Sequence, residues 1–156
     1  MSSSAWRTSR WLYSAGAILA GSSAFVATGA PAVPDPCKLI TAAELEQIAG
    51  PMKGAPKRGD IASGDVSCEY TSINANTTID ISLHEGGLGY WRKRNGGPNT
   101  LSLPKLGKDA FLNPDSESSA DLYAAKGTLI LRVSMPKGAA SVDTMVAIAQ
   151  KALSRL

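Results

Sequence analysis

Histidine and cysteine are scarce in this chain: of its 156 residues, one is histidine and two are cysteine. His84 is therefore the one imidazole on which a Ser-His-Asp triad or a histidine-rich metal cluster could draw. No G-x-S-x-G motif is present, and the cysteines lack both the C-x-x-C spacing and a zinc-site spacing. We therefore expect no metal, no cofactor and no nucleophilic hydrolase. We also expect His84 to be exposed on the polar face of a strand.

A strong excess of charge is also lacking. The chain holds 16 basic and 13 acidic residues, a net charge of +3. Arg7 and Arg10 lie in a segment that we expect to be removed, which leaves 16 − 2 = 14 basic residues and a balance of +1. Such a domain has no general electrostatic attraction for nucleic acid, and we expect no nucleic-acid partner. An apolar fraction of 44% excludes a largely disordered chain.

The N-terminal segment, residues 1–32, has the pattern of a secretory signal peptide. Arg7 and Arg10 supply a short positive region, and the apolar stretch that follows is short and diluted by glycine and serine. Ala32 completes a small-x-small cleavage site. We expect residues 1–32 to be removed and residues 33–156 to form a single domain; the alternative is an uncleaved N-terminal anchor.

Export predicts an oxidising compartment, periplasmic or extracellular, and no stable membrane span after cleavage. Ser22 stands where a bacterial lipoprotein signal would carry the lipidated cysteine, so lipid attachment is not expected. Two cysteines in an exported chain favour a disulfide, which must join Cys37 to Cys68. The alternative is two separate buried thiols.

Apolar periodicity and turn residues predict the secondary structure. A Thr41 to Glu44 capping box indicates a short helix over residues 41–49. Residues 53–65 have the composition of a loop. Alternation predicts an antiparallel hairpin of two strands around residues 66–71 and 77–84.

The second half of the chain continues this pattern. Residues 101–112 predict an edge strand, and residues 120–125 and 128–135 predict a second hairpin. An amphipathic helix begins after Ser141. The fold class is therefore α+β, with an antiparallel sheet of about four to six strands packed against a short N-terminal helix and a C-terminal amphipathic helix.

Several short motifs, taken in order, resemble a family of small exported bacterial proteins, often lipoproteins, that are described as a domain of unknown function. They are D-P-C-K-L-I-T at residues 35–41, C-E-Y at residues 68–70 and L-G-K-D-A-F at residues 106–111. The resemblance covers residues 35–156. It implies an envelope location and a disulfide, and it implies no catalytic residues.

One segment is distinctive enough to be a candidate binding site. Tyr90-Trp91-Arg92-Lys93-Arg94 places two aromatic residues beside three cations, and glycine pairs flank the segment. Tyrosine, tryptophan and arginine are the residues that most often anchor binding interfaces. The alternative is a short helix whose Leu88 and Trp91 pack on the sheet while its cations face solvent.

These observations lead to one functional expectation and two alternatives. We expect a non-enzymatic domain of the bacterial envelope that binds a small ligand or an envelope protein. The first alternative is an enzyme that acts on an envelope substrate through paired carboxylates. The second is a structural or assembly factor. The carboxylates that qualify by residue type are Glu44, Glu46, Glu69 and Asp80.

Overall fold

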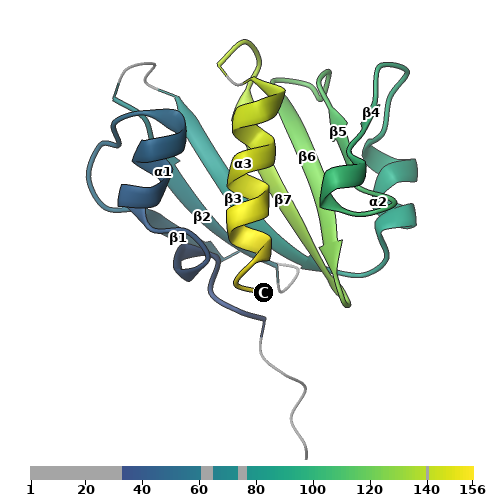
Figure 1. Ribbon diagram of the computed structural model, residues 1–156, viewed down its shortest axis with the longest axis horizontal. Coiled ribbons are helices and arrows are strands. Elements are labelled where there is room, and N and C mark those ends of the chain that lie inside the picture. Colours follow the sequence, from purple (N-terminus) through teal and green to yellow (C-terminus); the bar gives the residue numbers. More distant parts are fainter. Residues whose placement is uncertain (1–32, 61–64, 74–76, 140) are drawn as a thin grey trace, which may run out of the picture. The chain divides into compact units, whose positions relative to one another are not determined.

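The computed structural model describes residues 33–60, 65–73, 77–139 and 141–156. Within these residues seven antiparallel strands form one sheet in the order β1-β2-β3-β7-β6-β5-β4 (Figure 1). The strands are β1 (Lys57–Asp60), β2 (Val66–Thr71), β3 (Thr78–Glu85), β4 (Leu101–Ser102), β5 (Phe111–Asn113), β6 (Ser119–Lys126) and β7 (Leu129–Pro136). The helices are α1 (Ala42–Ala49), α2 (Leu88–Asn95) and α3 (Val142–Leu153), with 3₁₀ turns η1 (Pro36–Lys38) and η2 (Pro104–Leu106).

The α+β class and the antiparallel sheet are confirmed, but the expected strand number of four to six was too low. Strand β1 lies in the segment expected to be a loop and pairs with β2 at the edge of the sheet. Its mostly exposed residues give no apolar alternation from which to predict it. The expected edge strand over residues 101–112 is two short strands, because Pro104 starts a 3₁₀ turn between them.

Both expected hairpins are present and meet at the centre of the sheet. Strand β2 pairs with β3, and β6 pairs with β7. Gly127 has a φ of 63° in the β6–β7 turn, a conformation that glycine adopts without the strain a side chain would add. The pairing of β3 with β7 then joins the two hairpins.

The helix starts follow local capping as the sequence predicts. The Thr41 backbone N–H donates to Glu44 Oε2 at 3.0 Å, and the Glu44 N–H donates to Thr41 Oγ1 at 3.3 Å. At the start of α3 the Thr144 N–H donates to Ser141 Oγ at 3.1 Å. Each cap satisfies backbone donors that the first helical turn leaves without partners.

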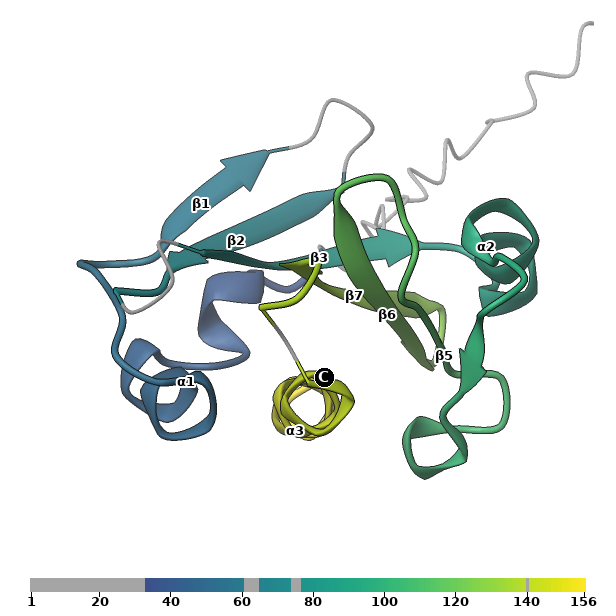
Figure 2. The same ribbon diagram turned by 90° about the horizontal axis from the view of Figure 1, so that it is seen from above.

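Helices α1 and α3 cover the same face of the sheet, as Figure 2 shows from above. The main core lies between them and the central strands. Ile81 and Leu83 of β3 are fully buried there, and so are Leu131 and Val133 of β7. Ile148 of α3 packs into the same cluster. Burial of these apolar side chains is the main favourable term in the stability of such a domain.

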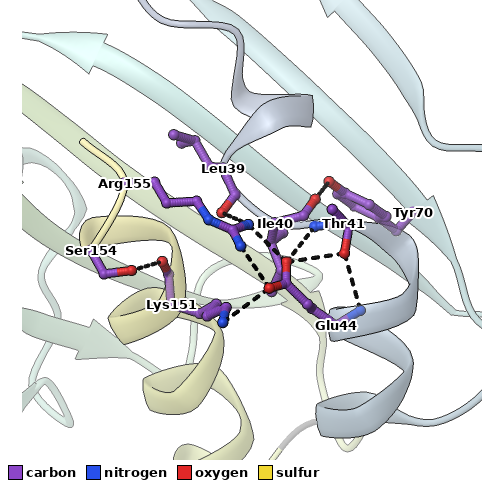
Figure 3. Close-up of polar contacts among 8 residues, drawn as sticks. All are labelled: Leu39, Ile40, Thr41, Glu44, Tyr70, Lys151, Ser154 and Arg155. Atoms are coloured by element: carbon purple, nitrogen blue, oxygen red, sulfur yellow. Dashed lines mark hydrogen bonds and ion pairs between the residues drawn. The ribbon is translucent and has the colours of Figure 1, made fainter.

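Glu44 connects the start of α1 to the end of the chain (Figure 3). The two terminal nitrogens of Arg155 donate to its carboxylate oxygens at 2.7 and 2.6 Å, and Lys151 Nζ lies 2.9 Å away. The hydrogen bond from Arg155 holds the pKa of Glu44 well below its usual range, with further lowering by the Thr41 backbone and Lys151. The network fixes α1 against the C-terminal end of α3.

The expected disulfide is present between Cys37 and Cys68, 31 residues apart in the chain. It ties η1 to β2, and Cys68 is buried in the main core. Beside it the Tyr70 hydroxyl donates to the Ile40 carbonyl at 2.6 Å (Figure 3). No helix among the described residues is long and apolar enough to cross a membrane. The predicted signal peptide, residues 1–32, lies outside the described residues.

Candidate functional site

The sheet face opposite α1 and α3 carries buried polar side chains. Because successive strand residues face opposite sides, the neighbours of the core residues point to this second face. Some of these neighbours are charged or strongly polar side chains, which are seldom buried without a partner. Those with exposures from 0% to 9% are Ser82 and His84 of β3, Asn113 of β5, Asp121 of β6 and Ser134 of β7.

Helix α2 covers one side of this polar face and packs through a small aromatic cluster. Leu88 and Trp91 pack against Phe111, Tyr123 and Ile130. The Tyr123 ring stacks between Phe111 and Trp91, with ring centroids 4.8 and 5.9 Å away. Figure 2 shows α2 beside β5 and away from α1 and α3. The cluster holds α2 at the rim of the polar face.

Two neighbouring cavities open between α2 and the polar face. The first, which we call the aromatic cavity, has a volume of about 470 Å³. The second, the serine cavity, has a volume of about 460 Å³. The aromatic cavity is lined by Asp65, His84, Tyr90, Trp91, Asp121 and Tyr123, and the serine cavity by Gly96, Asn113, Glu117, Ser118 and Ser119. Both are lined by Arg94, Asn95, Ser116 and Arg132.

Arg132 lines both cavities, and its partner Asp121 lines the aromatic cavity. Arg132 Nη2 donates to Asp121 Oδ1 at 2.9 Å and to Ser134 Oγ at 3.3 Å. Burial alone would lower the pKa of Arg132, but the Asp121 carboxylate raises it above its ordinary value. Burial raises the pKa of Tyr123, beside this pair, to about 12, and Asp121 adds to the effect. The Arg132 guanidinium therefore stays charged at neutral pH, and the Tyr123 hydroxyl stays protonated.

His84 is buried, with 5% of its surface exposed, so the expectation of an exposed histidine was wrong. The Trp91 ring lies over it with a centroid distance of 4.5 Å. Its Nδ1 lies 2.9 Å from Asp65 Oδ2, although not at a hydrogen-bonding angle, and its Nε2 lies 3.2 Å from Ser82 Oγ. Helix α2, which the strand pattern does not reveal, supplies the cover.

Asp65, His84 and Ser82 follow the order of a hydrolytic triad, but Ser82 is not placed as a nucleophile. Its side chain is fully buried in the central strand β3. On both sides its backbone is paired, with Ser67 of β2 and Arg132 of β7. No attacking path reaches it, and strand pairing leaves no pair of backbone N–H groups beside it for an oxyanion.

The five residues of the candidate binding segment, Tyr90 to Arg94, do not share one environment. Tyr90, Trp91 and Arg94 line the aromatic cavity. Tyr90 is 61% exposed, and its hydroxyl accepts a hydrogen bond from Arg94 Nη1 at 3.1 Å. Arg92 instead donates to Ser102 Oγ at 3.0 Å, with its guanidinium 5.5 Å from the Phe111 ring centre. Lys93 is exposed and lines neither cavity.

The four carboxylates considered for an enzyme lie on different parts of the fold. Glu44 holds Arg155, and Glu46 Oε1 accepts the Met52 N–H, both from α1. Glu69 and Asp80 are cross-strand neighbours on β2 and β3. Burial raises the pKa of Asp80, and nearby Glu69 adds to the rise. Glu69 lines neither cavity, so this pair does not face a bound ligand there.

The sequence analysis did not identify most of the residues that line the cavities. Asp121, Tyr123 and Arg132 alternate with core residues on β6 and β7, and that alternation was the signal available. Ser116 and Asn95 come from a loop and a helix end with no motif. Among the described residues, no three histidine, cysteine or acidic side chains are grouped to hold a metal ion.

Comparison with protein-family models, curated proteins and solved structures found no match to this chain.

Proposed function

We propose that this protein is a non-enzymatic binding domain of the bacterial cell envelope, and that it holds a small polar ligand in the aromatic and serine cavities. The observation that carries the proposal is the set of buried polar side chains that line the aromatic cavity. Asp121 is 2% exposed and His84 is 5% exposed on a sheet face that apolar residues would stabilise at lower cost. Buried, paired polar groups at the floor of an open cavity are typical of a binding site.

The arrangement supports binding rather than catalysis. His84 Nε2 contacts Ser82 Oγ, and its Nδ1 lies 2.9 Å from Asp65 Oδ2 without forming a hydrogen bond. Asp121 is engaged by Arg132 and by the Ser119 hydroxyl. Acid–base catalysis needs a group within hydrogen-bond reach of the substrate and free to exchange a proton. These groups instead orient each other and the walls of the cavities.

Export to the envelope is part of the same proposal. The disulfide between Cys37 and Cys68 supports it, because disulfides persist in oxidising compartments and are rare in the cytosol. The resemblance to exported bacterial proteins points the same way. Mass spectrometry of the protein isolated from its own cells tests this part: a new N-terminus at Val33 is expected, and a reduced, uncleaved chain in the cytosol would contradict it.

The test of binding is a screen of a library of small polar metabolites by two-dimensional NMR of ¹⁵N-labelled protein covering residues 33–156. We expect some compounds to shift the backbone amides of Gly96, Ser116 and Ser118 and the Trp91 indole N–H. No shifts with any compound, or shifts confined to the α1 and α3 face, would overturn the proposal.

A matched pair of variants locates the binding. Ser116→Tyr places a ring at a position that lines both cavities, and we expect it to abolish the shifts. Thr128→Tyr places the same ring at an exposed turn that lines neither cavity, and we expect it to bind as the native protein does. Equal binding by both variants would contradict the assignment of the site.

A further inference from the structure

Arg94 and Glu117 line the serine cavity, and each lacks an oppositely charged partner among the described residues. Arg94 comes from the last turn of α2, and its Nη1 donates a hydrogen bond to the Tyr90 hydroxyl. Glu117 comes from the loop between β5 and β6 and is exposed. The cavity therefore presents one unpaired positive charge and one unpaired negative charge from two separate walls.

The other acidic and basic side chains that line the two cavities contact one another inside the protein. Arg132 binds Asp121 at 2.9 Å, and Asp65 lies 2.9 Å from His84. These four groups lie on the strands or directly before β2, where burial and mutual contacts hold them. A ligand would gain little by displacing such contacts, since a buried charge left without its partner is costly. Arg94 and Glu117 are the charges available to a ligand.

We propose that the ligand is a zwitterion, a free α-amino acid or a dipeptide, whose carboxylate binds Arg94 and whose ammonium group binds Glu117. Planar guanidinium groups suit carboxylates because they offer two parallel donors. The Glu117 carboxylate carries the charge opposite to that of an ammonium group and can accept its hydrogen bonds. This inference rests on the proposed binding function and specifies its ligand class.

The aromatic cavity is suited to the side chain of such a ligand. It continues from the serine cavity through the shared residues Arg94 and Ser116. Tyr90, half-buried Trp91 and Tyr123 give it aromatic walls. Its volume of about 470 Å³ lies within the range of small-molecule sites. An aromatic side chain can therefore stack on these rings beside the Asp121–Arg132 pair.

The test compares three probes with the same side chain and different charged groups on the α-carbon, by isothermal titration calorimetry on residues 33–156. L-phenylalanine carries both charges, N-acetyl-L-phenylalanine lacks the ammonium group, and L-phenylalanine amide lacks the carboxylate. We expect L-phenylalanine to bind and each neutralised probe to bind about tenfold or more weakly, the effect of losing one charged hydrogen-bonded contact.

Two variants assign each charge to its partner. In Arg94→Gln, L-phenylalanine and its amide should bind equally, because the carboxylate has lost its contact. In Glu117→Gln, L-phenylalanine and the N-acetyl form should bind equally. Lys93→Gln and Glu85→Gln remove the same charges at exposed positions that line neither cavity, and they should bind as the native protein does.

The other outcomes separate this inference from the function on which it rests. Equal binding of L-phenylalanine and N-acetyl-L-phenylalanine by the native protein would show a simple anion site and overturn the inference. Failure of all three probes, with other compounds of the NMR library bound in the cavities, would overturn the inference and leave the proposed function standing. Failure of the whole library would overturn both.

Discussion

Asp121 and Arg132 lie diagonally across the β6–β7 pair, with Asp121 Oδ1 2.9 Å from Arg132 Nη2. The aspartate is 2% exposed, so its charge depends on the arginine and on the Ser119 hydroxyl rather than on water. Breaking a buried ion pair by removing one partner leaves an uncompensated charge, which costs far more than the pair contributes. The pair is therefore a point at which the site and the stability of the fold are coupled.

Replacing Asp121 by alanine should lower the free energy of unfolding by about 3–5 kcal/mol, because Arg132 would be left half-buried without its carboxylate. Urea unfolding followed by circular dichroism measures the change. The double variant Asp121→Leu with Arg132→Met should recover most of the loss, since no buried charge remains. A single variant as stable as the native protein would contradict the role given to the pair.

Acid should weaken the contact between α1 and the end of the chain. The pKa of Glu44 is lowered in the folded protein, so its stabilisation is present above the pKa of the unfolded carboxyl, about 4.5, and is lost as the pH falls below that value. In Glu44→Gln the difference in urea midpoint between about pH 7 and about pH 3 should shrink. Arg155→Gln should shrink it too, whereas Lys137→Gln, outside the network, should not.

Alkaline pH should unfold the protein as two buried tyrosines ionise. Burial raises the pKa of both Tyr70 and Tyr123 to about 12. Their contribution to stability is therefore complete below the unfolded pKa of about 10 and is lost as the pH rises through about 12. Near-ultraviolet absorbance should show a late tyrosinate step that decreases in Tyr70→Phe and in Tyr123→Phe. Ionisation of all tyrosines together near pH 10 in the folded protein would contradict this.

The disulfide should contribute about 3–4 kcal/mol to stability, the effect of closing a loop across a separation of 31 residues in the unfolded chain. The double variant Cys37→Ala with Cys68→Ala should unfold at correspondingly lower urea. Dithiothreitol should destabilise the native protein and leave the variant unchanged. If dithiothreitol destabilised both proteins equally, the disulfide would not be the source of the added stability.

Short sequence patterns predicted the helix caps and strands that depend on interactions between residues close together in the chain. The Thr41 capping box, the Ser141 cap and the alternation around Ile81 each act within a few residues, so the sequence shows them directly. Strand β1 escaped prediction because an edge strand held by backbone pairing needs no apolar pattern. The central β3–β7 contact joins residues about 50 positions apart, which no short pattern encodes.

The site was harder to predict because it is assembled from both hairpins. Trp91 and Arg94 were singled out as neighbours in sequence, but their partners Tyr123 and Arg132 come from later strands that the sheet order brings beside them. His84 was misassigned for a different reason, because the strand alternation does not show that Trp91 of the following helix packs over it. The lining of the two cavities therefore comes from the strands of both hairpins together with α2 and the loop between β5 and β6.

The alternation of residues along β6 has a further consequence. Leu122 and Ala124 pack under α3 while Asp121 and Tyr123 form the floor and wall of the cavities, so each strand contributes every second residue to each side. Selection can therefore alter cavity-wall residues on one side of the sheet without repacking the other. Proteins with this topology can diverge in ligand preference while retaining one scaffold, and the same property makes the sheet a practical template for engineering new binding specificities.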